Sequence, residues 1–219
     1  MKKMLTMLLT VCMLVTITAC GTQGTATSQT DVTTLTGEDA YTSQIELLDE
    51  GMTYYVDMEI ADYGTVTLQL NQSAAPITAA NFVALAESGF YDGLTFHRII
   101  SGFMVQGGDP KGNGTGGSDM KIKGEFAANG WDNPIKHERG VISMARTSEP
   151  NSATSQFFIM HLDSPGLDGQ YAAFGYVTEG LDVVDAICST AEPTDDNGSI
   201  ALIDQPVIET ITITIKTVS

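Results

Sequence analysis

The 219-residue sequence predicts a mainly β domain, built as a closed antiparallel barrel or a sandwich. Three observations lead to this fold class. Short apolar runs with a two-residue period recur along the chain, and this is the period of a half-buried strand. Only two segments have the three- and four-residue spacing of a helix. The regular alternation of strand and helix that would predict a parallel sheet does not occur.

The first strands form a predicted hairpin. Apolar residues alternate with other residues over 54–60 and again over 66–70. The intervening residues 62–64 have the sequence Asp-Tyr-Gly, which is typical of a turn. Further strands are expected at 95–100, 103–107, 141–145, 155–160, 172–177 and 207–217.

Two helices are expected beside these strands. Pro76 suits a first helical position and Gly89 suits a helix end. The apolar positions between them, at helical spacing, are Ala79, Phe82, Val83 and Ala86. A second helix is expected over 181–188.

The N-terminus has the pattern of a secretory signal. Lys2 and Lys3 precede an apolar run over 4–17 that is too short for a stable spanning helix. The residues that follow, Ile-Thr-Ala-Cys20, resemble the bacterial lipobox. That resemblance implies cleavage before Cys20 and lipidation of this cysteine, which would anchor the protein outside the cytoplasmic membrane. The alternative is an ordinary signal peptide that happens to contain a cysteine.

The chain therefore divides into three predicted regions. Residues 1–19 form the lipoprotein signal peptide, 20–53 the lipidated cysteine with a flexible tether, and 54–219 the folded domain. The tether is rich in Thr, Ser and Gly, a composition that cannot bury enough apolar area to fold. Residues 21–37 would span a root-mean-square distance of about 20–25 Å. The end of this region, 38–53, is compatible with a short helix or an added strand.

Charge and cysteine content exclude several classes of function. The chain has 27 acidic and 10 basic residues, a net charge of −17. Loss of the two signal-peptide lysines would take it from −17 to −19. Such a charge argues against a nucleic-acid partner and against electrostatic adhesion to anionic lipid. After processing, only Cys188 would remain as a free thiol, and it is expected to pack in the core, so no disulfide framework is predicted.

Familiar catalytic motifs are missing from the sequence. There is no G-x-S-x-G motif for a hydrolase, and His97, His137 and His161 lack metal-ligand spacing. These histidines are expected to be structural or surface residues. The glycines of residues 112–117 match G-x-G-x-x-G, but no convincing helix follows, so a tight loop is favoured over a dinucleotide site. No metal and no cofactor are predicted.

Three polar side chains stand out within apolar strands. Strands with aromatic residues are usually core, but Arg98 lies in an apolar run and requires a specific acceptor. Gln106 and Gln156 lie in similar runs, where an amide must find hydrogen-bond partners. These residues mark a candidate functional site.

The segments around these residues are similar to those of cyclophilin-type peptidyl-prolyl isomerases. The matching segments are PITAANFVAL (76–85), FHRIISGFMVQGGD (96–109), NGTGG (113–117), SMARTSEPNSATSQFFI (143–159) and LDGQYAAFGYV (167–177). The resemblance covers about 54–217. It implies a closed eight-stranded antiparallel β-barrel capped by two α-helices, with an active groove on its outer face.

The resemblance also implies roles for individual residues. Arg98 would be the catalytic residue, and Gln106 and Gln156 would hold it and polar groups of the peptide in place. The apolar pocket for the proline ring would be formed by Phe103, Met104, Phe158 and Leu167.

Further residues would bind the peptide beyond proline. The backbone of Arg146, beside Ala145 and Thr147, would pair with the residue that precedes proline. Gly114 would border a neighbouring pocket. Tyr171 stands where the family often has histidine. Gly166 stands where many members have Trp or Phe, which implies weak binding of cyclosporin-type macrocycles.

The resulting hypothesis is an isomerase for X–Pro bonds of exported, unfolded proteins. Its partners would be proline-containing peptides and, through Cys20, the membrane. Nothing in the sequence predicts an obligate oligomer, so a monomer is expected. The alternative is a proline-peptide binding or chaperone module with incidental turnover, although Arg98 favours the enzyme, since binding alone would not require it.

Overall fold

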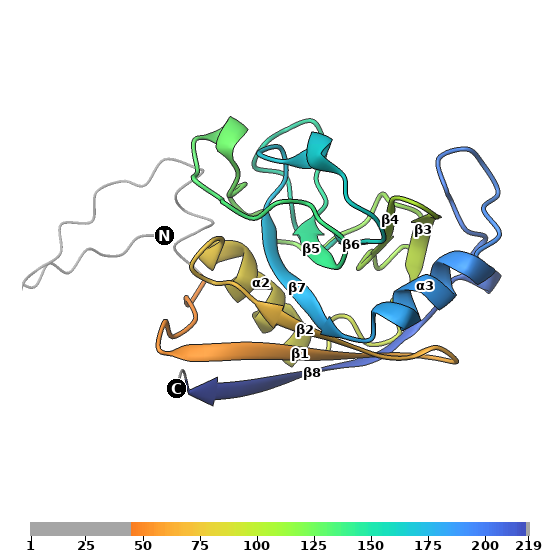
Figure 1. Ribbon diagram of the computed structural model, residues 1–219, viewed down its shortest axis with the longest axis horizontal. Coiled ribbons are helices and arrows are strands. Elements are labelled where there is room, and N and C mark those ends of the chain that lie inside the picture. The colour runs from red at the N-terminus through yellow and green to blue at the C-terminus, as the bar shows by residue number, and fades with distance from the viewer. Residues whose placement is uncertain (1–44, 218–219) are drawn as a thin grey trace, which may run out of the picture. The chain divides into compact units, whose positions relative to one another are not determined.

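The computed structural model describes residues 45–217, which fold as a mainly β domain (Figure 1). The strands are β1 (Met52–Ile60), β2 (Gly64–Leu70), β3 (Phe96–Ile100), β4 (Met104–Gly107), β5 (Val141–Met144), β6 (Phe157–Met160), β7 (Ala173–Glu179) and β8 (Ile208–Thr217). The helices are α2 (Pro76–Glu87) and α3 (Leu181–Thr190), with short 3-10 helices at Ala127–Asn129, Pro165–Leu167 and Leu202–Asp204.

Each predicted strand and helix is present, with boundaries that differ by no more than two residues. β1 begins at Met52, so the last residues of the ambiguous 38–53 segment are strand, and 45–49 are irregular. The signal peptide, Cys20 and most of the predicted tether lie outside the described residues. No helix of the described part is long and apolar enough to cross a membrane.

The predicted closed barrel is wrong, because the sheet is an open half-barrel. Its strand order is β3-β4-β6-β5-β7-β2-β1-β8, with all neighbours antiparallel. The edge strands β3 and β8 meet only where they begin, through an isolated bridge between Thr95 and Val207. There the Phe96 amide donates to the Pro206 carbonyl at 3.0 Å.

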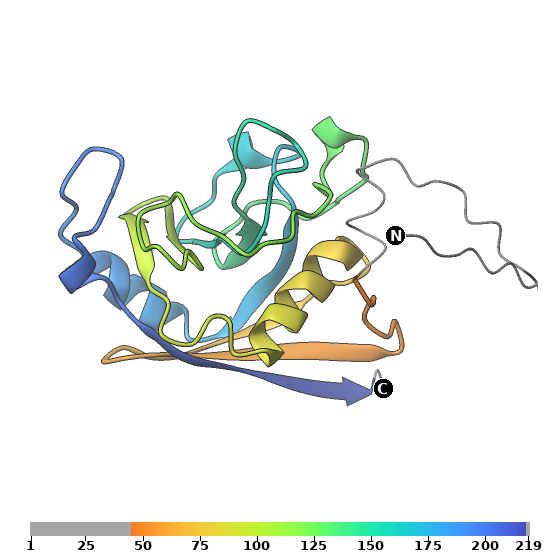
Figure 2. The same cartoon turned by 180° about the vertical axis from the view of Figure 1, so that it is seen from behind.

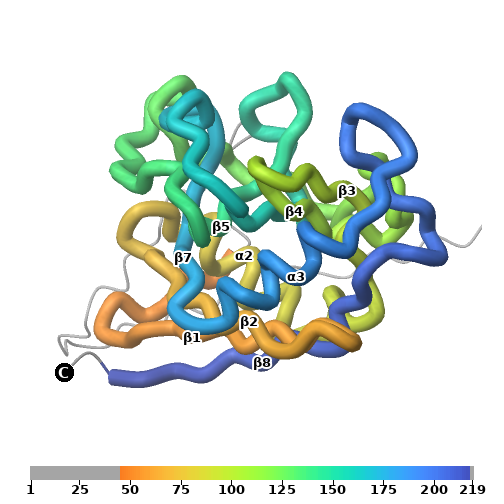
Figure 3. Tube along the Cα trace, turned by 45° about the vertical axis from the view of Figure 1, so that its right-hand side comes forward, coloured from red at the N-terminus to blue at the C-terminus, as the bar shows by residue number. Residues whose placement is uncertain are grey.

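The free edge of β3 is occupied by another segment. Residues 197–200, which follow α3, pair with it: Arg98 bridges Ser199, and the Ile99 amide donates to the Gly198 carbonyl at 2.8 Å. Figure 3 shows the blue part of the chain that follows α3 next to β3. Gly198 has φ +83°, and a Cβ there would lie 2.7 Å from the Ile99 carbonyl oxygen, so glycine permits the contact. The segment covers the edge that β8 would need for closure.

Side-chain alternation gives the sheet an inner and an outer apolar face. On β6, Phe157 and Ile159 belong to the main core, whereas Phe158 and Met160 belong to a second, smaller cluster. On β4, Val105 belongs to the main core and Met104 belongs to the smaller cluster. The two-residue period of a strand directs neighbours to opposite faces. An apolar surface therefore lies outside the half-barrel as well as inside it.

The two helices lie toward opposite ends of the long strands β1 and β8 (Figures 1 and 2). α2 packs on β8 and β7, and α3 packs on β2 and β4. Cys188 of α3 is a buried free thiol in the main core, and burial raises its pKa to about 11. Its position agrees with the expected packing role.

A buried carboxylate caps the start of α2. Glu125 accepts hydrogen bonds from the Ile77 amide (3.0 Å), the Thr78 amide (2.8 Å) and the Thr78 hydroxyl (2.6 Å). The first amides of a helix have no partner within the helix. Burial raises the pKa of Glu125, while the three donors favour its charged form.

We predict that Glu125→Ala lowers the free energy of unfolding by about 2–4 kcal/mol, because buried donors lose their acceptor. Urea denaturation measures this change. Glu87→Ala, at an exposed position of the same helix, is the control and should change stability little. Equal effects of the two substitutions would contradict the assigned capping role.

Candidate active site

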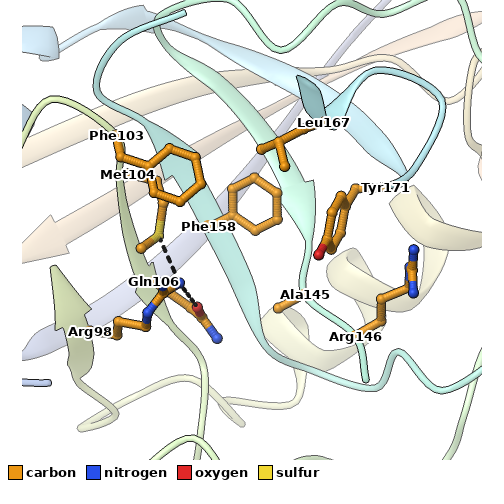
Figure 4. A pocket seen from close by; sticks show the side chains of 9 residues that line it. All are labelled: Arg98, Phe103, Met104, Gln106, Ala145, Arg146, Phe158, Leu167 and Tyr171. Carbon is orange, nitrogen blue, oxygen red and sulfur yellow. Dashed lines mark hydrogen bonds between the residues drawn. The ribbon is translucent and has the colours of Figure 1, made fainter. Parts of the chain in front are cut away.

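The outer face of the half-barrel contains a pocket between β3, β4, β6 and the loops that follow β5 and β6 (Figure 4). Its lining residues are Arg98, Phe103, Met104, Gln106, Ala145, Arg146, Phe158, Leu167 and Tyr171. The apolar side chains come from the smaller outer cluster and its partly buried neighbours. The same alternation that forms the core therefore also forms this pocket.

Arg98 supplies the positive charge at one side of the pocket. Its Nε donates to the Asn197 carbonyl at 2.7 Å, and its Nη1 donates to Gln106 Oε1 at 3.2 Å. The Met104 sulfur lies 3.9 Å from the same Nη1. Burial lowers the pKa of the guanidinium, but arginine remains charged in proteins. The side chain is held at two points and keeps further N–H donors for a ligand.

A chain of amide hydrogen bonds connects Arg98 with the glycine-rich loop. Gln106 Nε2 donates to Gln156 Oε1 at 2.9 Å. Gln156 Nε2 then donates to the carbonyl of Gly116 at 2.7 Å and to that of Gly114 at 3.2 Å. Each amide is thereby fixed in one orientation, and Gln106 has its oxygen directed toward the guanidinium.

A second pocket adjoins the first and shares Gln106, Ala145 and Arg146 with it. Its other lining residues are Gly114, Thr115, Gly116, Thr147, Ser152, Thr154 and Gln156. The Arg146 guanidinium lies between the rings of Phe126 and Tyr171, 4.8 and 4.7 Å from their centroids. Arg146 thus lines both pockets, and its side chain is fixed by the two rings.

The structure places all twelve residues predicted for catalysis and substrate binding around these two pockets. Nine line the first, and the remaining three, Gly114, Thr147 and Gln156, line the second. Their individual roles stay predictions. The Asn197 carbonyl was not predicted, because a backbone acceptor has no side-chain signature in the sequence. Thr115 and Gly116 were also missed, although they lie within the NGTGG segment that points to this loop.

The three histidines lie in different environments, and the glycine-rich loop runs into an irregular segment. His97 and His137 are buried, whereas His161 bridges the Gly102 amide and Asp185. Within residues 45–217, no group of three metal-ligating side chains occurs. No helix follows the glycines in the segment 118–126, so the helix N-terminus that a dinucleotide site requires is missing there.

Comparison with known proteins points to one family. Residues 55–217 match the family described as "Cyclophilin type peptidyl-prolyl cis-trans isomerase/CLD". The chain is 49% identical over 126 residues to a peptidyl-prolyl cis-trans isomerase of Helicobacter pylori, covering 57% of this chain and 75% of the relative. It is 48% identical over 123 residues to peptidyl-prolyl cis-trans isomerase B of Bacillus subtilis, covering 56% and 82%.

A solved structure agrees with this family. A Cryptosporidium parvum cyclophilin-type isomerase, crystallised in the presence of the dipeptide Ala-Pro, superposes with a TM-score of 0.64 at 34% identity. The match covers 73% of this chain and 98% of that one. Fold, pocket and sequence therefore lead to the same conclusion: the chain belongs to the cyclophilin-type family and is a peptidyl-prolyl cis-trans isomerase.

Proposed function

We propose that this isomerase acts outside the cytoplasmic membrane, on X–Pro bonds of exported proteins, while a lipid on Cys20 anchors it. The observation that carries this proposal is the order of the N-terminal residues. Two lysines precede an apolar run, and Ile-Thr-Ala-Cys20 follows at the place of a lipobox. X–Pro isomerisation is slow enough to become the rate-limiting step when an unfolded chain folds after export.

The charge of the domain fits a tethered arrangement. A net charge of −19 after processing would repel the domain from an anionic lipid surface. A covalent lipid together with the Thr-, Ser- and Gly-rich tether would hold the domain near that surface without requiring contact. We propose that the domain works there as a monomer, with its two pockets open to unfolded chains.

The reaction requires only a modest lowering of the activation barrier. Amide resonance gives the X–Pro bond a barrier of about 18–20 kcal/mol. Uncatalysed exchange takes about 10–100 s. A turnover of about 10 s⁻¹ therefore requires a rate increase of roughly three orders of magnitude, which corresponds to lowering the barrier by about 4 kcal/mol. Such a gain requires no covalent intermediate. Differential binding of the twisted amide is sufficient.

The position of Arg98 in the pocket supports a role in this differential binding. When the amide twists, the proline nitrogen becomes pyramidal and regains a lone pair that accepts a hydrogen bond. The free guanidinium donors beside the apolar side chains would stabilise this form more than the planar one. Because Asn197 and Gln106 already hold the side chain, little reorganisation is needed. The ring of proline would lie against Phe103, Met104, Phe158 and Leu167.

We predict that Arg98→Ala lowers kcat about a hundredfold, because the donor to the transition state is lost. The dissociation constant of a short Ala-Pro peptide should change by no more than about threefold. A proline-isomerisation assay and a peptide titration on the soluble domain measure the two quantities. Arg139→Ala is the matched control, since Arg139 pairs with Asp185 and lines neither pocket. An unchanged kcat in Arg98→Ala would favour the binding-module alternative.

We predict that Gly166→Trp strengthens binding of a cyclosporin-type macrocycle about tenfold or more. Position 166 is exposed and a Cβ there meets no atom within 4 Å, so an aromatic side chain can be attached without a clash at its base, and it would cover the macrocycle. Affinity for short X–Pro peptides should stay within about twofold. Titration of both ligands tests this expectation, and it is wrong if the wild type already binds the macrocycle as tightly as the variant.

We predict that the wild-type protein is lipidated and partitions with membranes, whereas Cys20→Ser is not lipidated. Fractionation and mass spectrometry of the N-terminal peptide measure this difference. Cys12→Ser, within the apolar run, is the matched control and should behave as wild type. Recovery of wild type as free protein that begins at another residue would refute the anchor while leaving the isomerase activity intact.

A further inference from the structure

A partly buried series of hydrogen bonds runs next to the side chains that line the proline pocket. His137 Nδ1 lies 3.2 Å from Asp168 Oδ1, and His137 Nε2 lies 3.1 Å from Ser143 Oγ. The backbone amide of His137 also donates to Asp168 Oδ1, at 2.8 Å. His137 is 1% exposed and Ser143 is fully buried. The isomerase mechanism uses none of these three side chains directly.

The partners determine how the imidazole is protonated. Asp168 can only accept hydrogen bonds when ionised, so Nδ1 carries the proton. Burial lowers the pKa of His137, which keeps the ring neutral. Nε2 is then an acceptor and receives the hydroxyl proton of Ser143. Every hydrogen-bonding atom of the ring is therefore paired, and the ring plane is fixed.

The order Asp–His–Ser is that of a hydrolase triad, but nucleophilic chemistry does not follow from it. Such a serine must reach a substrate carbonyl. Ser143 is fully buried and lines neither pocket. The hydrogen bonds between Asp168, His137 and Ser143 therefore have a structural role, which is to fix the side chains around the pocket.

His137 contacts two walls of the pocket directly and is bonded to the residue that follows a third wall. Its ring stacks on Phe158, with centroids 6.0 Å apart and planes at 19°. It lies in an edge-to-face arrangement with the ring of Tyr171, with centroids 6.4 Å apart and planes at 77°. Its hydrogen-bond partner Asp168 directly follows Leu167, the third wall residue. These walls belong to β6, to the loop before β7 and to the turn at 165–167, which share no strand pairing with one another.

We propose that His137 is a positioning residue of the isomerase, which sets the spacing of Phe158, Leu167 and Tyr171 and thereby the affinity for the proline ring. This inference depends on the isomerase activity and not on the membrane anchor. Arg98 is held by other partners, Asn197 and Gln106. Loss of His137 should therefore weaken peptide binding and leave the chemical step nearly unchanged.

The decisive variant is His137→Phe, which keeps a ring against Phe158 and removes both ring hydrogen bonds. The dissociation constant of a short Ala-Pro peptide should rise about tenfold, while kcat stays within about threefold. Asp168→Asn keeps an accepting oxygen and should bind the peptide nearly as wild type does. Asp168→Ala removes that oxygen and should weaken binding as His137→Phe does. Asp168 is partly exposed, so this second pair provides the test if His137→Phe does not fold.

Thr78→Val is the control for a general loss of stability. It removes a buried hydrogen bond to Glu125 and lines neither pocket. All variants are assayed at a temperature at which circular dichroism shows them folded. Thr78→Val should keep the wild-type dissociation constant. The proposal is overturned if folded His137→Phe binds the peptide as wild type does, if it loses kcat instead of affinity, or if Asp168→Asn and Asp168→Ala bind equally well.

Discussion

The orientation of one guanidinium is the constraint on which the rest of the site depends. Arg98 is half-buried beside apolar side chains, where a charge without partners would be costly. Its Nε is satisfied by the Asn197 carbonyl and one Nη1 proton by Gln106. Gln106 is in turn fixed by Gln156 and the glycine-rich loop. The guanidinium is therefore held in one geometry at the pocket before a peptide arrives, which is the condition for electrostatic preorganisation.

The open edge of the half-barrel contributes directly to this geometry. If β8 paired along β3, residues 197–200 could not lie beside Arg98. The close approach of Gly198 to β3 instead brings the Asn197 carbonyl within 2.7 Å of Nε. The two-residue period of β4 and β6 then supplies apolar neighbours on the same outer face. The site therefore depends on two features of the sheet: the edge of β3 that β8 leaves unpaired, and the apolar outer face of β4 and β6.

Local patterns in the sequence predicted most of the fold. Alternating residues located the strands, and Pro76 and Gly89 located α2, because these signals depend on neighbours along the chain. The open edge was mispredicted, since backbone pairing between 197–200 and β3 has no side-chain pattern. Arg98 in an apolar run marked the site, but the Asn197 carbonyl and the partners of His137, six and thirty-one residues away, could be found only in three dimensions.

The most direct test of this site is a double-mutant cycle on Arg98 and Gln106. The value kcat/KM is measured for wild type, Arg98→Ala, Gln106→Leu and the double variant. If Gln106 acts by holding the guanidinium, it has nothing to hold once Arg98 is removed. The double variant should then be no slower than Arg98→Ala alone. If the reductions in kcat/KM of the two single variants multiply in the double variant, Gln106 acts independently of Arg98. That result would contradict the claim that the site depends on the orientation of Arg98 by its hydrogen bond to Gln106.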